Sequence, residues 1–322
     1  MQKPLESNSV SMAEELPLIQ ILAVILITLG GFFGLGPLFG ALFTYPIIGT
    51  DYQQLSDLNA LSTNFNLKYA TLIIQATATL LGFLVLPIGY LYSKGYKAPF
   101  TATPTQAKQR GLQLVVLFAA VIAFMVADQA VIEWNANMVL PEFMKGFEAW
   151  ARQTEDQLAG VTQALTNFHS FAYFMFVFVV IAVLPAFGEE LIFRGVIQKQ
   201  MHVRGINPHL AIWVAAVLFS SLHMQFYGFF PRLLLGALFG YFSYWSGNLR
   251  YAIFAHFLNN GITLIGLYAF QTGSSTLDFD TEQGVNYTWV VAALAVFIAL
   301  MFVFYKLTLQ KDKNDEKLAE GF

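Results

Sequence analysis

The sequence predicts an all-α, polytopic membrane protein with about eight transmembrane helices. Of its 322 residues, 57% are hydrophobic and only 11% are charged, and the mean hydropathy is +0.58. Soluble globular domains contain about 25% charged residues, so this composition indicates a chain that lies mostly in lipid. The net charge of −3 does not suggest a nucleic-acid partner. The lack of cysteine excludes a disulfide framework, a thiolate metal site and a cysteine nucleophile.

Several apolar windows reach the ~20 residues that a helix needs to span a bilayer. We expect helices at residues 17–44, 69–92, 111–133, 168–200, 208–228, 230–246, 250–270 and 288–308. The first should remain as an anchor, because its acidic flank and long apolar stretch do not resemble a cleavable signal. Within it, Gly30 and Gly34, and also Gly36 and Gly40, are spaced for close helix packing.

Basic residues in the connections predict the orientation in the membrane. They occur in four connections, as Lys94, Lys97, Lys108 and Arg110, then Lys199 and Arg204, then Arg250, and finally Lys306, Lys311, Lys313 and Lys317. The alternate connections 45–68, 134–170 and 271–287 are poor in basic residues or carry an acidic excess. Because basic connections tend to stay in the cytoplasm, both termini are expected there.

Two adjacent glutamates lie in the fourth expected span, within the stretch GEELIFR. Glu190 and Arg194 are four residues apart, so they share a helix face in the order that favours an ion pair. Glu189 projects about 100° away around the helix and lies roughly 15 Å from the basic end, at 1.5 Å per residue. A carboxylate at that depth is costly, so we expect a partner on another helix.

Two other spans supply polar partners. In LFSSLHMQF, Phe219 and His223 share one face of the fifth span, and in YAIFAHFLNNG, His256 and Asn260 share one face of the seventh. Counting residues from the helix starts places Glu189, His223 and Asn260 in one layer, with His256 one turn nearer the cytoplasm. A lone histidine in a span is more often a hydrogen-bonded core residue, but this combination on three spans indicates a site.

These residue types are suited to the hydrolysis of an acyl bond. A carboxylate among apolar side chains can serve as a general base that activates water. Imidazole and asparagine can hold that water or donate to a developing oxyanion. Glu189, His223 and His256 equally make a candidate zinc set with an open position for water. The residues alone leave both mechanisms open.

The three motifs resemble those of the CPBP family of intramembrane proteases, which contains the CAAX prenyl endopeptidases and the bacteriocin-processing and immunity proteins. EELIFRG resembles the family's EExxxRG signature, FSSLH its FxxxH motif and HFLNN its HxxxN motif, in the same order. The resemblance covers roughly residues 165–270, a four-helix core. Residues 1–164 would add three helices and an external loop, and residues 271–322 a last helix with a charged tail. One departure is Arg250–Tyr251, where the family often has proline after an apolar residue.

The resemblance implies a role for each motif residue. Glu189 would activate the water, and His223 would help to position it. His256 and Asn260 would stabilise the oxyanion. Members of the family are commonly called metalloproteases, yet a glutamate base needs no bound metal, so zinc remains an open cofactor with Glu189, His223 and His256 as its candidate ligands.

Supporting roles are implied for three more residues. Glu190 would be the partner of the water-activating glutamate, Arg194 would hold the Glu190 carboxylate, and Phe219 would be a packing neighbour. The implied substrate is a membrane-associated peptide or protein, which the family allows to be prenylated or lipid-anchored. Two alternatives are a non-catalytic immunity or scaffold member of the family, and a transporter that relays protons. A transporter would be expected to have inverted repeats and broken helices, and the sequence indicates neither.

Overall fold

A computed structural model describes residues 15–96, 107–275 and 285–319. Throughout these ranges the regular structure is helical and no strand occurs, which confirms the expected all-α class. Six helices are long and apolar enough to cross a membrane: Leu18–Ser56, Phe65–Ser93, Arg110–Ala136, Phe171–Val203, Leu249–Gln271 and Tyr287–Thr308. The polytopic membrane fold is thus confirmed, with six rather than eight helices meeting the criterion. Lys97 and most of the connection 271–287, which entered the orientation prediction, lie outside the described residues.

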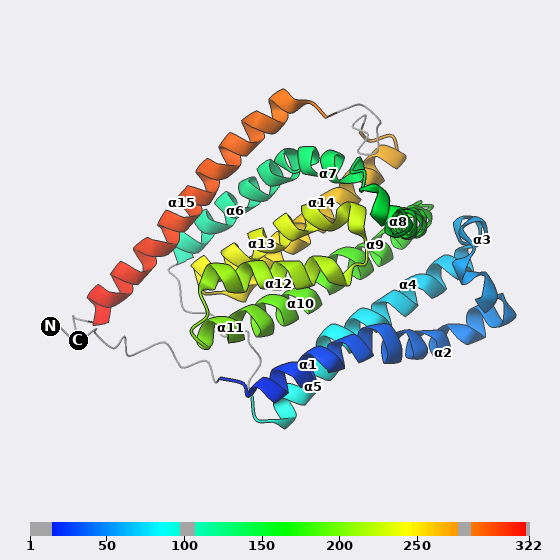
Figure 1. The fold of residues 1–322 in the computed structure, drawn as a ribbon, viewed down its shortest axis with the longest axis horizontal. Coiled ribbons are helices and arrows are strands. Elements are labelled where there is room, and N and C mark those ends of the chain that lie inside the picture. Colours follow the sequence, from blue (N-terminus) through cyan, green and yellow to red (C-terminus); the bar gives the residue numbers. More distant parts are fainter. Residues whose placement is uncertain (1–14, 97–106, 276–284, 320–322) are drawn as a thin grey trace.

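An N-terminal pair of long helices forms one side of the bundle (Figure 1). Its elements are α1 (Leu18–Gly30), π-helical η1 (Gly31–Leu35), α2 (Gly36–Ile48), 3-10-helical η2 (Gly49–Ser56), α3 (Leu58–Thr63), α4 (Phe65–Thr79), π-helical η3 (Leu80–Val85) and α5 (Leu86–Ser93). A Cβ on Gly36 or Gly40 would lie 2.4 or 2.6 Å from backbone atoms of α4. Gly30 and Gly34 face open space, and Gly31 makes the close contact with η3 instead. The predicted close packing is therefore confirmed for one glycine pair and wrong for the other.

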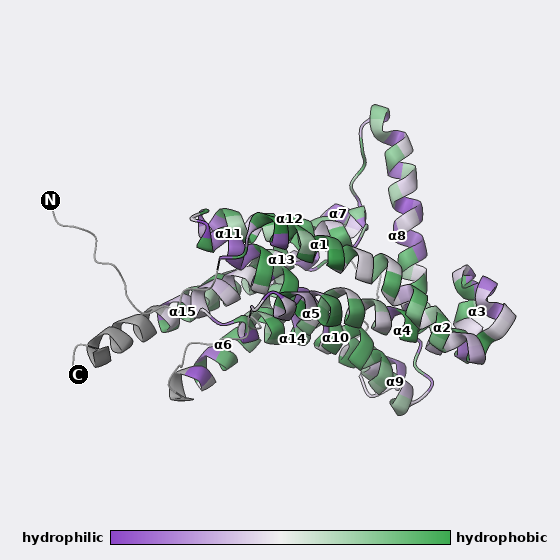
Figure 2. Cartoon of the chain, turned by 90° about the horizontal axis from the view of Figure 1, so that it is seen from below, coloured by the Kyte–Doolittle hydropathy of each residue, from purple (hydrophilic) through white to green (hydrophobic). Residues whose placement is uncertain are grey.

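The opposite side of the bundle is formed by α6 and α15, which lie side by side (Figure 1). The elements of this part are α6 (Ala107–Ala127), α7 (Gln129–Ala136), 3-10-helical η4 (Glu142–Met144), α8 (Lys145–Leu165) and α15 (Tyr287–Ala319). Helix α8 is seen end-on in Figure 1 and projects away from the bundle in Figure 2, where polar and apolar residues alternate along it. It is therefore an amphipathic helix that crosses one end of the bundle.

The centre of the bundle contains the three motifs. Its elements are α9 (Phe171–Phe178), π-helical η5 (Val179–Val183), α10 (Leu184–Glu190), π-helical η6 (Leu191–Gln198), α11 (Lys199–Val203), α12 (Pro208–Leu222), 3-10-helical η7 (Phe226–Gly228), α13 (Phe229–Ser246) and α14 (Leu249–Gln271). α12 and α13 pack against each other as a hairpin. α12 has 15 residues, so it is about 22 Å long and shorter than the ~30 Å hydrocarbon layer. The hairpin tip, residues 223–228, consequently lies within the bundle rather than beyond it.

Four chain segments lie toward the end of the bundle opposite to α8. The start of α1, the start of α6, helix α11 and the end of α15 all lie there (Figure 1). Arg204, just after α11, pairs with Glu15 at 2.8 Å and donates to the carbonyl of Leu16. These two contacts fix the segment before α1 beside α11.

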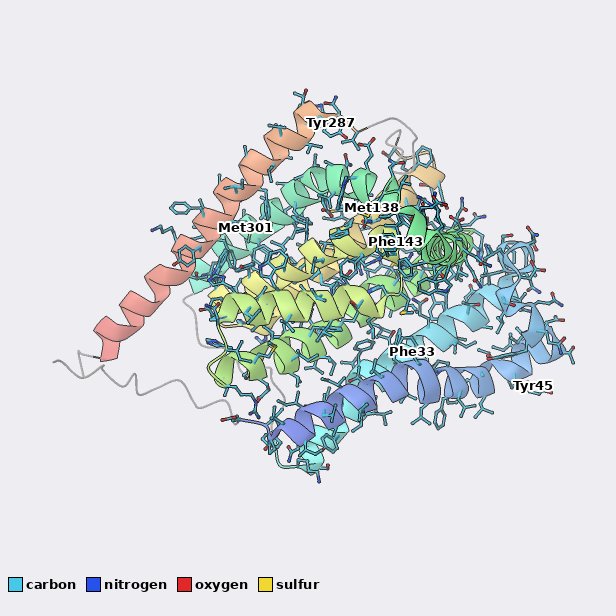
Figure 3. The ribbon with its side chains drawn as sticks, in the orientation of Figure 1. Phe33, Tyr45, Met138, Phe143, Tyr287 and Met301 are labelled. Carbon is cyan, nitrogen blue, oxygen red and sulfur yellow. The ribbon has the colours of Figure 1, made fainter. Side chains whose placement is uncertain are left out.

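The outer surface of the long helices is apolar. Phe33 and Tyr45, which Figure 3 labels on the first long helix, are 58% and 63% exposed. Val115 and Phe302, on α6 and α15, are 65% and 59% exposed. Large exposed apolar side chains of this kind are expected where helices face lipid instead of water.

Candidate active site

The two glutamates end a short α-helix that lies between two π-helical segments. α10 follows η5 and precedes η6, which contains Arg194. π-helical turns are uncommon in proteins and occur frequently at functional sites. Pro185 explains the first one, because proline has no N–H to donate to the carbonyl of Ile181, four residues earlier. The backbone of this span is therefore irregular on both sides of Glu189 and Glu190.

Glu190 and Arg194 form the predicted ion pair, and the pair is fully buried. Arg194 Nη1 lies 2.7 Å from Glu190 Oε1, and both side chains are 0% exposed. Arg194 Nη2 also donates to the carbonyl of Gly236 on α13 at 2.5 Å. One turn further, Gln198 donates to the carbonyl of Gly240 at 3.0 Å. A buried ion pair persists only with such added hydrogen bonds, so the arginine fixes the glutamates against α13.

His256 lies between the two carboxylates. Its Nδ1 is 2.9 Å from Glu190 Oε1, and its Nε2 is 4.0 Å from Glu189 Oε2. Since Glu190 is already held by Arg194 as an anion, it accepts a hydrogen bond from Nδ1–H of the imidazole. In the neutral ring this leaves the lone pair on Nε2, directed toward Glu189. α14 thereby supplies the partner on another helix that Glu189 was expected to need.

Two phenylalanines position both His256 and Arg194. The Phe239 ring is stacked on His256, with centroids 5.0 Å apart, and Phe219 makes an edge contact with it at 5.9 Å. The Arg194 guanidinium lies 4.8 Å from the centroid of Phe219 and 5.6 Å from that of Phe239. Phe219 is thus a packing neighbour of the site. Phe239 was missed by the sequence analysis, since nothing distinguishes it from other aromatic residues of the sixth span.

His223 approaches from the tip of the α12–α13 hairpin. It follows the last residue of α12, and its Nδ1 lies 2.9 Å from the carbonyl oxygen of Phe219. The next residue, Met224, has a φ of +56°, a left-handed conformation that residues other than glycine rarely adopt. Such strained positions cluster at functional sites, where surrounding structure holds them in place. The backbone at Met224 therefore sets the direction in which His223 and the following residues point.

Asn260 contacts an earlier turn of the span that carries the glutamates. Its Nδ2 donates to the carbonyl of Ile181 at 3.1 Å, and its Oδ1 accepts from Asn259. Ile181 precedes Glu189 by eight residues, about 12 Å along a helix. The structure thus differs from the expected layer, because His256 rather than Asn260 lies level with the glutamates. The reason is Pro185, whose missing N–H leaves the Ile181 carbonyl to the asparagine.

The candidate zinc ligands do not fit a metal site in this arrangement. Within residues 15–96, 107–275 and 285–319, no group of three or more His, Cys, Asp or Glu side chains is placed so that it could hold a metal ion. His256 Nδ1 contacts Glu190, an arrangement that metal-ligating histidines also have. The His256 Nε2 atom, however, lies 4.0 Å from Glu189 Oε2, wider than the roughly 3.3 Å between two ligands of one tetrahedral zinc. The side chains are arranged for hydrogen bonding to one another.

Arg232 is a charged residue near the site that the sequence analysis missed. It lies in the first turn of α13 and interacts electrostatically with Glu189 and His223. Its Nη2 donates to the side chain of Gln225 at 2.6 Å, and Gln225 donates to Glu155 of α8 at 2.9 Å. The sequence could have identified Arg232, because an arginine inside the expected span 230–246 is unusual and such residues often mark functional sites.

Helix α8 covers the hairpin tip through aromatic and charged contacts. Phe147 makes an edge contact with Phe226 at 5.3 Å, and the Arg152 guanidinium lies 4.2 Å from the centroid of the Tyr227 ring. Arg152 also pairs with Glu148 at 2.9 Å. This hydrogen-bonded arginine lowers the pKa of the Glu148 carboxyl below its ordinary value. The tip that carries His223 therefore lies under an amphipathic helix, not under open solvent.

Comparison with known proteins points to the same part of the chain. Residues 171–262 match the model of a family described as type II CAAX prenyl endopeptidase Rce1-like. A Bacillus subtilis (strain 168) protein named "Uncharacterized protein YpbD" is 24% identical over 154 residues, which cover 46% of this chain and 66% of that protein. No solved structure matches.

The matched residues contain all three motifs and every side chain of the site described above except those on α8. The match begins at the first residue of α9 and ends in the middle of α14. It leaves out the N-terminal helices, α8 and α15. The resemblance to the CPBP proteases is thus confirmed for this part of the chain, since residues 171–262 are similar to the Rce1-like domain of the type II CAAX prenyl endopeptidases.

Proposed function

We propose that this protein is an intramembrane endopeptidase that hydrolyses a peptide bond with a water molecule activated by Glu189. The observation that carries the proposal is the series Arg194–Glu190–His256–Glu189, in which each member lies within 4.0 Å of the next. Only the last of these, Glu189, has an appreciably exposed side chain, at 12%. Glu189 is a carboxylate that lies beside an oriented histidine and is partly exposed, and this is the geometry of a general base.

The proposed reaction begins with one water molecule between Glu189 and His256. Atoms 4.0 Å apart can both lie within hydrogen-bond distance of a single water, so Glu189 Oε2 and His256 Nε2 would hold its two hydrogens. Glu189 takes a proton as the water oxygen bonds to the carbonyl carbon of the peptide. When the C–N bond breaks, Glu189 returns this proton to the leaving nitrogen. The products are a new amine and a new carboxylic acid, which then releases its proton to water and becomes a carboxylate.

The developing oxyanion needs hydrogen-bond donors. Asn260 Nδ2 carries two hydrogens, of which one is directed at Ile181. Asn260 lies one turn of α14, about 6 Å, from His256. We assign its second hydrogen to the oxyanion of a peptide bound along α14 between these two residues, and His223 to the positioning of water and substrate from the hairpin tip. His256 is assigned to the water rather than to the oxyanion, since its Nδ1–H is engaged by Glu190.

A non-catalytic immunity or scaffold role would not require this geometry. Such a protein could keep the buried Glu190–Arg194 pair for stability, but it would have no use for a second, partly exposed carboxylate beside an oriented histidine. We therefore prefer the enzyme, whose substrate would be a membrane-associated peptide or protein, with or without a prenyl group or other lipid anchor.

A proteomic comparison tests the proposed activity in cells. Membranes that contain the wild-type protein are compared with membranes that contain Glu189→Gln, and new N- and C-termini are mapped by mass spectrometry. The proposal requires termini that appear only with the wild-type protein. Identical terminal peptides in both samples, with equal amounts of protein inserted, would favour the non-catalytic role.

We further propose that both chain termini face the cytoplasm. Single cysteines can report this cleanly because the native chain has none. An impermeant thiol reagent added to intact cells should leave a cysteine at Ser93 unmodified and should label one at Ser275. Ser93 ends α5 beside Lys94, whereas Ser275 follows α14 at the other end of the bundle. The reverse labelling pattern would overturn the orientation.

A further inference from the structure

The reaction assigned to Glu189 gives no role to Arg232, a charged residue beside the site. Arg232 lies in the first turn of α13, on the side of the site that α8 covers. Within the described part of the chain, no carboxylate lies within 4.0 Å of its guanidinium, whereas Arg194 has one at 2.7 Å. An arginine at membrane depth is costly unless it is paired, so its position requires an explanation.

The side chain is held in place by neighbours that leave part of it open. Gln225 accepts from Nη2 at 2.6 Å with its side chain and from Nη1 at 3.5 Å with its backbone carbonyl. Two of the five N–H groups of the guanidinium are used in this way. A Cβ on Gly228 would lie 2.7–2.9 Å from the guanidinium atoms, so a side chain there would displace the guanidinium from this position. Gly228 has a φ of −117°, and the backbone conformation itself does not require glycine.

Gln225 links this arginine to the covering helix. The amide accepts from Arg232 with its oxygen and donates to Glu155 of α8 with its nitrogen. Glu155 therefore balances the arginine charge only at a distance, through one intervening amide. As whole residues, Arg232, Glu189 and His223 are each partly exposed, and Arg232 interacts electrostatically with the other two. This group differs from Glu190, Arg194 and His256, all of which are buried.

We propose that Arg232 binds a carboxylate of the peptide substrate and so fixes the position of the scissile bond relative to Glu189. A guanidinium fork matches a carboxylate with two parallel hydrogen bonds, and this geometry selects an acid over an amide. The carboxylate could be the C-terminal carboxylate of the peptide or an aspartate or glutamate side chain near the cleaved bond. The proposal rests on the function proposed above, because it deepens the specificity of that site.

Binding rather than cleavage provides the test. Glu189→Gln protein in detergent micelles is immobilised, so that bound peptides stay intact, and is exposed to random octapeptides with a palmitoylated N-terminus. One pool has free C-terminal carboxylates and the other has C-terminal carboxamides. Retained peptides are identified by mass spectrometry. The same measurement is made with Arg232→Gln added, with Gly228→Ala added, and with Arg250→Gln added as a matched loss of an exposed charge.

We expect carboxylate-bearing peptides to be retained roughly tenfold or more over neutral ones, the usual gain from a charge-assisted pair. Preference for the acid pool would identify the C-terminus, and enrichment of Asp or Glu within the carboxamide pool would identify a side chain. Arg232→Gln and Gly228→Ala should both remove the preference, and Arg250→Gln should keep it. Gly228→Ala retains the charge, so it remains informative if Arg232→Gln does not fold.

Equal retention of acidic and neutral peptides, or a preference that survives both Arg232→Gln and Gly228→Ala, would overturn the assignment. The outcome is separate from that of the proposed hydrolysis. Peptides retained by Glu189→Gln are afterwards offered to the wild-type protein, and a carboxylate preference without cleavage would contradict the peptidase while leaving the arginine site in place. Cleavage without a carboxylate preference would contradict only the role of Arg232.

Discussion

Glu189 and Glu190 are neighbours in the sequence, yet they lie in two different surroundings. Glu190 is 0% exposed, pairs with Arg194 at 2.7 Å and accepts from His256 at 2.9 Å. Glu189 is 12% exposed, lies 4.0 Å from His256 and faces a partly open group with His223 and Arg232. The Glu190 carboxylate is therefore bound by the protein itself, whereas the Glu189 carboxylate remains available for a water molecule or a substrate.

The largest effect on stability should come from breaking the buried Glu190–Arg194 pair. Arg194→Ala leaves Glu190 buried and uncompensated, so we expect the free energy of unfolding to fall by ~3–5 kcal/mol. Glu190→Gln combined with Arg194→Met removes both charges and should cost much less. Thermal unfolding in detergent measures both variants. Arg204→Ala, which breaks the half-exposed pair with Glu15, is the control and should cost under ~1 kcal/mol. Equal melting temperatures for the single and the double variant would contradict the pair.

An effect of similar size, but on catalysis, is expected at Asn260. Asn260→Ala should lower kcat by roughly 10²–10³, the usual loss for one oxyanion donor, with little change in KM. Asn259→Ala removes the neighbouring amide and should have a small effect on kcat. If Asn260 served only to satisfy the Ile181 carbonyl, Asn260→Ala would reduce the melting temperature and leave kcat of the folded fraction unchanged.

The smallest effect on stability is expected in α8, the helix that covers the hairpin tip. The pKa of Glu148 is lowered in the folded protein, mainly by its hydrogen bond from Arg152. Because the unfolded chain then binds this proton more tightly, the contribution of Glu148 to stability is present above its ordinary pKa of 4.5 and is lost as the pH falls through the lower folded value.

Thermal unfolding between pH 7 and pH 3 measures this contribution. The melting temperature of the wild-type protein should exceed that of Glu148→Gln at pH 7, and the difference should shrink below about pH 4.5. Asp156→Asn, an exposed position on the same helix, is the matched control and should show no such pH-dependent difference. A difference that stays constant over the whole range would contradict the role of the Glu148–Arg152 pair.

Spacing and composition were sufficient to predict the fold class and the buried Glu190–Arg194 pair. Apolar windows located the spans because every lipid-facing helix must be apolar along its length. The separation of four residues between Glu190 and Arg194 was enough to predict their contact, since both residues lie on one helix. The glycine spacing was less informative, because it gave the period of packing but not which face meets α4.

Contacts between residues on different helices could not be predicted from spacing and composition. Residue counting assumes regular helices, and Pro185 with its π-helical neighbours breaks that assumption, so Asn260 lies at Ile181 while His256 reaches the glutamates. The short α12 places His223 at a hairpin tip, which depends on how α7 and α8 fill the space beyond it. Arg232 could have been found from its charge alone, but its link to Glu155 joins residues 77 positions apart.

The central claim is that Glu189 activates water for the hydrolysis of a peptide bond, and isotope labelling tests it most directly. Purified protein in liposomes is incubated with the palmitoylated peptide pool in water enriched in oxygen-18, and the new C-termini are analysed by mass spectrometry. With the wild-type protein, each new carboxylate should carry one oxygen-18 atom. Glu189→Gln should lower the rate of appearance by roughly 10²–10⁴, the range of a general base. New termini that form equally fast with Glu189→Gln, or no new termini with the wild-type protein, would contradict the account.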